Sequence, residues 1–130
     1  HNDCVQITFL DIGSGIPATV RKNFMEKIQR LFSDATDSEL IKSALHGEFR
    51  TTTNKPNRGT RLPQIFNSAQ QSNIEMFSIF SGMGKCLVGE NGYIESVTHE
   101  KALDGTLYYW KIVKDESGDD DVAYNSKRFF

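Results

Sequence analysis

The stretch 5–17 constrains the fold more than any other part of the chain. Val5, Ile7 and Phe9 alternate with Gln6, Thr8 and Leu10, which predicts a strand with one buried face. Asp11 continues this alternation, so its carboxylate should point to the apolar side, where it is costly without hydrogen-bond donors. Two glycines and a proline follow, which suit a tight turn and the first turn of a helix. A strand, an inward-facing acid, a glycine turn and a helix together indicate a ligand pocket.

Three interpretations of this stretch compete. The first is a plain Asp-Gly turn between a strand and a helix. The second is a dinucleotide site, because residues 13–18 fit the pattern G-x-G-x-x-A. That site needs a second parallel strand ending in an acid about 20 positions later, whereas residues 33–37 are polar and follow a predicted helix directly. The third is a resemblance: residues 11–16, DIGSGI, look like the D-x-G-x-G-I box of the GHKL ATPases, which include gyrase and the histidine kinases.

Composition limits the classes of protein that this chain can represent. It has 130 residues, enough for one domain with a core, and a net charge of −2 with dispersed basic residues, so nucleic acid is not expected as a partner. No apolar run approaches about 18 residues and no signal peptide is evident, which predicts a soluble, cytoplasmic piece without a membrane segment. Cys4 and Cys86 are too isolated for a disulfide framework and should be reduced strand residues. The three histidines lack ligand spacing, so no metal site is predicted within this piece.

Hydrophobic periodicity predicts helices first and strands later. One amphipathic helix should run from Pro17 to Phe32, and a capping box at 36–39 should open a short helix that ends near Gly47. A further helix is predicted for 62–72. Strands are predicted for 74–80, 85–88, 93–97 and 106–113, with a turn at 81–84 and a hairpin at Asn91-Gly92.

The segment 46–61 differs from its surroundings, because it is polar, long and without period. Such loops are often lids over a binding site. Four basic residues in this segment have no acid between them: Arg50, Lys55, Arg58 and Arg61. The segment leads through Gly59 into a helix, and this combination suits phosphate. The alternative is a solvated basic loop.

Two more motifs extend the resemblance. Residues 58–65, RGTRLPQI, are similar to the G-x-G-L box that closes the ATP lid of histidine-kinase-type domains, with Arg61 where the second glycine is expected. Residues 103–107, LDGTL, match the Gly-Thr that opens the last strand of the family fold. With three boxes in order, the resemblance implies a Bergerat-like α/β fold over 1–113. This is a two-layer sandwich with a mixed, mostly antiparallel sheet and helices on one face, its N-terminal part missing.

The resemblance also implies ATP as the ligand. Asp11 would accept a hydrogen bond from the adenine amine. The full set of implied ATP-binding residues is Asp11, Gly13, Gly15, Ile16, Lys55, Arg58, Gly59, Thr60, Arg61, Leu62 and Thr106. The family helix that supplies a water-activating acid and an asparagine for Mg²⁺ has no match here, and we expect it upstream of the chain. Catalytic residues are therefore not assigned, and the fragment alone should be inactive.

The function implied for the full-length protein is ATP binding with hydrolysis, or with phosphoryl transfer to a protein phosphoacceptor. The alternative is a non-catalytic nucleotide sensor or interaction module with a regulatory partner, which Arg61 in the lid box favours. The acidic segment 114–130 should be a solvated, disordered tail.

Overall fold

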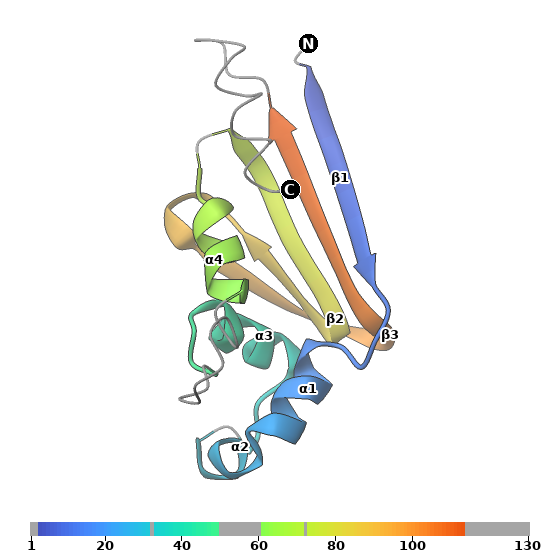
Figure 1. The fold of residues 1–130 in the computed structure, drawn as a ribbon, viewed down its shortest axis with the longest axis vertical. Helices are drawn as coiled ribbons and strands as arrows, with labels where there is room; N and C mark the ends of the chain where they lie inside the picture. Colours follow the sequence, from blue (N-terminus) through green and yellow to red (C-terminus); the bar gives the residue numbers. More distant parts are fainter. Residues whose placement is uncertain (1–2, 32, 50–60, 72, 114–130) are drawn as a thin grey trace.

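The fold is mixed α/β, with four helices packed against a three-stranded antiparallel sheet in the order β1-β3-β2 (Figure 1). The computed structural model describes residues 3–31, 33–49, 61–71 and 73–113. Its elements are β1 (Cys4–Asp11), α1 (Ile16–Asn23), α2 (Met25–Leu31), α3 (Asp37–Leu45), α4 (Arg61–Ser68), β2 (Ile74–Val88), the 3-10 turn η1 (Glu90–Gly92) and β3 (Ile94–Val113). Every strand pair in these ranges is antiparallel, so the predicted mixed sheet is not what the described residues form.

Two long strands, β2 and β3, form one hairpin, which joins what the sequence predicts as separate strands. The predicted hairpin turn is confirmed: Asn91 and Gly92 have φ of 59° and 78°, and Val88 pairs with Ile94. The predicted turn at 81–84 is wrong, because β2 continues through it with shifts in register around Gly82 and Gly84. A Cβ on Gly84 would collide with the backbone of Ser38, so glycine here lets β2 pass directly beneath the start of α3.

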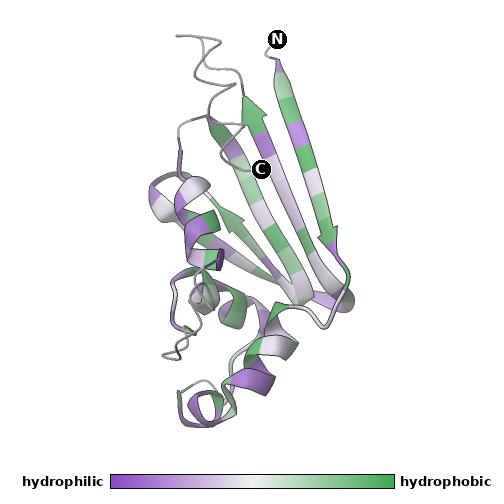
Figure 2. Cartoon of the chain, viewed as in Figure 1, coloured by the Kyte–Doolittle hydropathy of each residue, from purple (hydrophilic) through white to green (hydrophobic). Residues whose placement is uncertain are grey.

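Strand β1 lies at the sheet edge away from α3 and α4 (Figure 1). Its register places Ile7 opposite Trp110 and Asp11 opposite Thr106, so the predicted sharing of one face by Ile7 and Asp11 is confirmed. The alternation of its hydropathy is visible in Figure 2. Its predicted burial is wrong for Val5 and Phe9, which are 53% and 56% exposed, because the helices gather over β2 and β3 and leave the edge strand open.

The helices partly follow the prediction. The helix predicted for 17–32 is two helices, since the backbone at Phe24 leaves helical geometry (φ −127°, ψ 41°) and its ring packs on Phe49 at 5.4 Å. The cap of α3 is confirmed: the Thr36 hydroxyl accepts a hydrogen bond from the Glu39 N–H. Gly47, with φ of 83°, follows the end of α3 as predicted. The helix α4 begins at Arg61 and ends four residues before the predicted limit, where a turn leads into β2.

Helix α3 divides the apolar interior into two clusters. Ile41 and Leu45 face the sheet core, which also contains Ala69, Ile74, Phe77, Ile79, Cys86, Val88, Ile94 and Ile112. Leu40 and Ala44 face the helical core, which also contains Val20 and Phe49. Among the described residues, no helix has the length and apolar character that crossing a membrane requires.

Candidate functional site: a cavity at the end of β1

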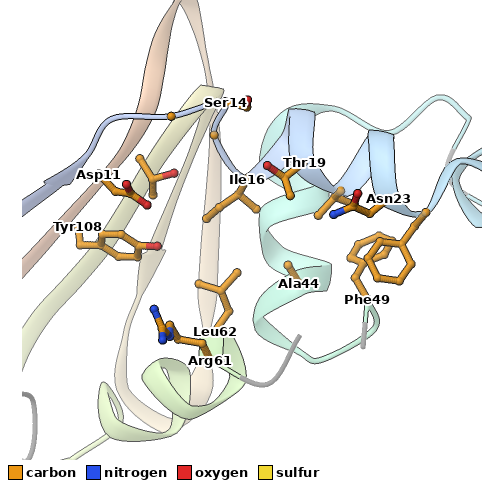
Figure 3. A pocket seen from close by; sticks show the side chains of 15 residues that line it. Asp11, Ser14, Ile16, Thr19, Asn23, Ala44, Phe49, Arg61, Leu62 and Tyr108 are labelled. Carbon is orange, nitrogen blue, oxygen red and sulfur yellow. The ribbon is translucent and has the colours of Figure 1, made fainter. Parts of the chain in front are cut away.

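A cavity of about 590 Å³ lies between the end of β1, helices α1 and α3, the start of α4 and strand β3 (Figure 3). This volume is within the usual range for small-molecule sites. It is lined by Asp11, Gly13, Ser14, Gly15, Ile16, Thr19, Val20, Asn23, Phe24, Ala44, Phe49, Arg61, Leu62, Thr106 and Tyr108.

Seven of the residues singled out in the sequence meet in this cavity. They come from three separate motifs: Asp11, Gly13, Gly15 and Ile16 from the first, Arg61 and Leu62 from the second, and Thr106 from the third. The other four, Lys55, Arg58, Gly59 and Thr60, lie outside the described residues.

The glycine turn after β1 is held in a shape that other residues would not adopt. Gly15 has φ of 86°, and a Cβ there would lie 2.8 Å from the Ser81 hydroxyl oxygen. Gly105 on β3 has φ of 114°, and a Cβ there would collide with the Asp11 carbonyl oxygen. Gly13, in contrast, has open space where its Cβ would be. Close backbone contact therefore explains two of these glycines, and Gly13 is the one with room for a ligand.

Ser81 connects the glycine turn after β1 to the sheet. Its side chain is fully buried, and its Oγ accepts a hydrogen bond from the Ile16 N–H at 2.9 Å and donates to the Gly105 carbonyl at 2.7 Å. The Thr106 hydroxyl lies 2.9 Å away. One hydroxyl thus joins β2, β3 and the start of α1, which fixes two walls of the cavity relative to each other. The sequence places Ser81 in a turn and does not single it out.

An ion pair between Arg21 and Asp37 connects α1 to the start of α3 and to the sheet. Arg21 Nη1 lies 2.6 Å from Asp37 Oδ1, and Asp37 Oδ2 accepts a hydrogen bond from the Met83 N–H at 2.8 Å. The Asp37 carboxylate therefore connects α1, the first turn of α3 and β2. Because Ile16, Thr19 and Val20 of α1 line the cavity, this contact connects that wall to α3 and β2.

The cavity is polar at the end formed by Asp11, Tyr108 and Arg61 (Figure 3). Burial raises the pKa of the Tyr108 phenol, the Asp11 carboxylate raises it further, and Arg61 opposes this rise. The phenol is therefore neutral near neutral pH. No ion pair joins Arg61 to a carboxylate of the described residues. An acceptor, a neutral hydroxyl and a cation thus face one space.

The other end of the cavity is mainly apolar, with Asn23 as a polar residue beside Phe49 (Figure 3). Phe24 and Phe49 form it together with Val20, and Phe49 is only 4% exposed. Lys27 donates a hydrogen bond to the Glu48 carbonyl and lies 5.4 Å from the centre of the Phe49 ring. Glu48 and Phe49, in the first part of the predicted lid, therefore contact Lys27 of α2, and the His46 ring packs on Phe66 of α4 at 5.3 Å. Residues 50–60 of the predicted lid lie outside the described residues.

Several residues of the cavity lining are not predicted from the sequence, and Tyr108 is the most important of them. The sequence predicts it only as a residue of the strand 106–113. A signal was present: Tyr108 follows Thr106 by two positions, so both side chains project from the same face of β3. Thr19, Asn23 and Phe24 carry no comparable signal, because their helix has an ordinary amphipathic pattern.

A metal site is not formed by the residues that the structure covers. No group of three or more His, Cys, Asp or Glu side chains gathers among them, and Asp11 is the one carboxylate that they contribute to the cavity lining. The Mg²⁺ that the resemblance implies therefore has no fitting set of ligands in this part of the chain.

Comparison of the chain with protein-family models, curated proteins and solved structures gave no match.

Proposed function

We propose that this chain forms the adenine-binding and lid-bearing part of a GHKL, histidine-kinase-type ATP-binding domain with a Bergerat-like fold. One observation carries the proposal: three motifs that are far apart in the sequence line a single cavity. The motifs occupy residues 11–16, 58–65 and 103–107, so they are widely separated along the chain. Motifs present by chance at the end of β1, the start of α4 and the middle of β3 would have no reason to line one cavity.

The cavity offers each part of a nucleotide a suitable contact. Asp11 is exposed to the cavity on the face of β1 that also carries Ile7 and Phe9, and it accepts a hydrogen bond from the exocyclic amine of adenine. Ile16 and Leu62 present apolar surface from opposite walls to the faces of the ring (Figure 3). The open side of Gly13 leaves space for the sugar to pass the turn.

Arg61 contributes the positive charge that a triphosphate requires. Its guanidinium enters the cavity from the first residue of α4, where the family has a glycine. A cation at this place offsets the loss of a glycine that would have brought backbone N–H groups to the phosphate. Mg²⁺ has no ligand set among the described residues, and it enters none of these contacts.

A non-catalytic nucleotide sensor is the second candidate, and Arg61 is the observation that favours it. A side chain of this size in place of glycine keeps a nucleotide bound without necessarily arranging it for chemistry. Release of phosphate from ATP by the full-length protein supports the ATPase or kinase. Saturable binding of ATP without turnover and without transfer to a protein supports the sensor.

The test of the binding site is Asp11→Asn in the full-length protein. This change keeps the shape of the side chain but turns an acceptor towards the adenine amine into an N–H donor. A hydrogen bond to a charged group contributes about 1.5–3 kcal/mol, so ATP affinity should fall roughly 10- to 150-fold. GTP should lose less, because its ring carries an acceptor where adenine has the amine. Calorimetric titration with both nucleotides measures the two effects.

The matched control is Asp104→Asn, since Asp104 is an exposed carboxylate on β3 that does not line the cavity. It should leave both affinities unchanged. A folded Asp11→Asn protein with unaltered ATP affinity would remove this carboxylate from the site and contradict the proposal.

A further inference from the structure

We propose that the Tyr108 hydroxyl donates a hydrogen bond to the ring nitrogen next to the adenine amine, so that Asp11 and Tyr108 together select the base. This inference rests on the proposed function. It adds a second specificity-determining residue, from the third motif, that the sequence pattern does not indicate.

The sheet places the two groups side by side. Phe9 pairs with Tyr108 and Asp11 with Thr106, so Asp11 and Tyr108 project from the same face of neighbouring strands as diagonal partners. Diagonal partners in an antiparallel pair have Cβ atoms about 7–8 Å apart or less, and long side chains bridge that separation. In Figure 3 the Asp11 carboxylate and the Tyr108 phenol oxygen both point into the cavity from the same side.

Both polar groups are free to meet a ligand. None of the hydrogen bonds between described residues involves the Asp11 carboxylate or the Tyr108 hydroxyl. Some polar side-chain atoms are inaccessible to solvent and lack a hydrogen-bond partner, but the Tyr108 hydroxyl is not one of them, so it is accessible from the cavity. A half-buried phenol with no internal partner gains a full hydrogen bond when a ligand supplies an acceptor.

The ring of Tyr108 is held in place by its neighbours. It lies 6.0 Å from the Phe9 ring and 6.0 Å from the Trp110 ring, nearly parallel to the latter at 16°. Contacts on both sides limit rotation of the side chain, so the hydroxyl is directed into the cavity before a ligand arrives. Such preorganisation lowers the entropic cost of binding.

Protonation makes this hydroxyl a donor. Burial, followed by the nearby Asp11 carboxylate, raises the pKa of Tyr108, so the phenol keeps its proton across the physiological range. Asp11 is an acceptor when ionised. An acceptor beside a donor complements the edge of adenine, on which an amine and a ring nitrogen are adjacent.

The experiment compares Tyr108→Phe with the wild-type protein, using ATP and 1-deaza-ATP, in which a C–H replaces that ring nitrogen. A neutral hydrogen bond contributes about 0.5–1.5 kcal/mol, so Tyr108→Phe should bind ATP roughly 2- to 12-fold more weakly. The wild-type protein should bind 1-deaza-ATP more weakly by the same factor. Tyr108→Phe should show no further loss with 1-deaza-ATP, because the hydrogen bond is already absent.

Tyr109→Phe is the matched control, since it makes the same chemical change on the opposite face of β3, away from the cavity. It should leave both affinities unchanged. Equal losses with both ligands in Tyr108→Phe, or no loss with either, would overturn the inference while ATP binding itself stands. Absence of ATP binding by the wild-type protein would instead overturn the proposed function and the inference with it.

Discussion

The sheet core and the cavity lie on two sides of α3, and they are packed to different degrees. On one side Ile41 and Leu45 are fully buried against β2 and β3. On the other side Leu40 and Ala44 belong to a smaller cluster that borders a cavity of about 590 Å³. The interior therefore consists of close-packed apolar side chains on one side of α3, and of an open cavity with polar groups at one end on the other side.

The sheet core stabilises the fold, whereas the polar groups of the cavity are available to bind a ligand. In the sheet core, side chains satisfy one another, and a ligand would have to displace them. In the cavity, the fold leaves an acceptor, a donor and a cation facing solvent. Mutations on the two sides of α3 should therefore change different quantities, and the four predictions below test this division.

The largest effect is expected in the sheet core. Leu45→Ala removes a fully buried side chain and leaves a cavity, which should lower the free energy of unfolding by about 2–5 kcal/mol. Urea denaturation measures the loss. Leu31→Ala is the control, because Leu31 is 61% exposed and its truncation should change stability by less than about 0.5 kcal/mol. A fall in ATP affinity of folded Leu45→Ala would show that the two regions are coupled through α3.

Ser81→Ala should affect both regions at once, because Ser81 joins the sheet to the wall of the cavity. The Ile16 N–H loses its acceptor and a buried carbonyl loses a donor, which should cost roughly 1–3 kcal/mol of stability. ATP affinity should fall as well, since the turn is no longer held to β2. Ser78→Ala, on the opposite face of β2, is the control for both denaturation and titration. Lower stability with unchanged affinity would make Ser81 a purely structural residue.

Arg61→Ala should change binding and leave stability nearly as it is, because Arg61 is exposed at the mouth of the cavity. If its guanidinium contacts the phosphates, ATP affinity should fall about 10-fold while adenosine affinity stays the same. Titration with both ligands separates the two. Arg30→Ala, on α2 and outside this cavity, serves as the control. Tighter binding of ATP by Arg61→Ala would mean that the side chain obstructs the site.

The smallest effect is the contribution of Cys86, in the sheet core, to the dependence of stability on alkaline pH. Burial raises the pKa of the Cys86 thiol from 9.0 to about 11. The Cys86 thiol therefore ionises at a lower pH in the unfolded chain than in the folded protein. Its contribution to the free energy of unfolding is complete below pH 9 and is lost as the pH rises towards 11. Between pH 9 and pH 10 the loss should be roughly 1 kcal/mol. Cys86→Ala should lack this component of the pH profile.

Cys4→Ala is the control for that measurement, because Cys4 is exposed. Denaturation of the three proteins across this pH range isolates the contribution of the buried thiol. Alkylation of Cys86 in the native protein as fast as that of Cys4 would show that the sheet core is open to water, and the contrast with the cavity would be lost.

Much of the local structure follows from the sequence, because it depends on short-range geometry. The alternation in β1, the cap at Thr36, the positive φ of Gly47 and the Asn91-Gly92 turn are each set by a few neighbouring residues. The residue types of the three motifs are likewise read from the sequence, but their meeting around one cavity depends on how β1, α1, α4 and β3 pack.

What the sequence does not reveal depends on contacts between distant residues. The break at Phe24 accompanies packing on Phe49, and β2 runs through 81–84 because its glycines let α3 approach. The exposure of Phe9 follows from where the helices lie, which periodicity cannot report.

By itself, the sequence determined the strand that ends in Asp11, the glycine turn after it, the capped helix and the hairpin, since local backbone preferences suffice for each. Only the tertiary structure decided that Ser81 would hold the turn and that Tyr108 would stand beside Asp11. Both are ordinary residues in their own segments. They gain their roles from strand register and from burial, which arise only when the whole chain packs.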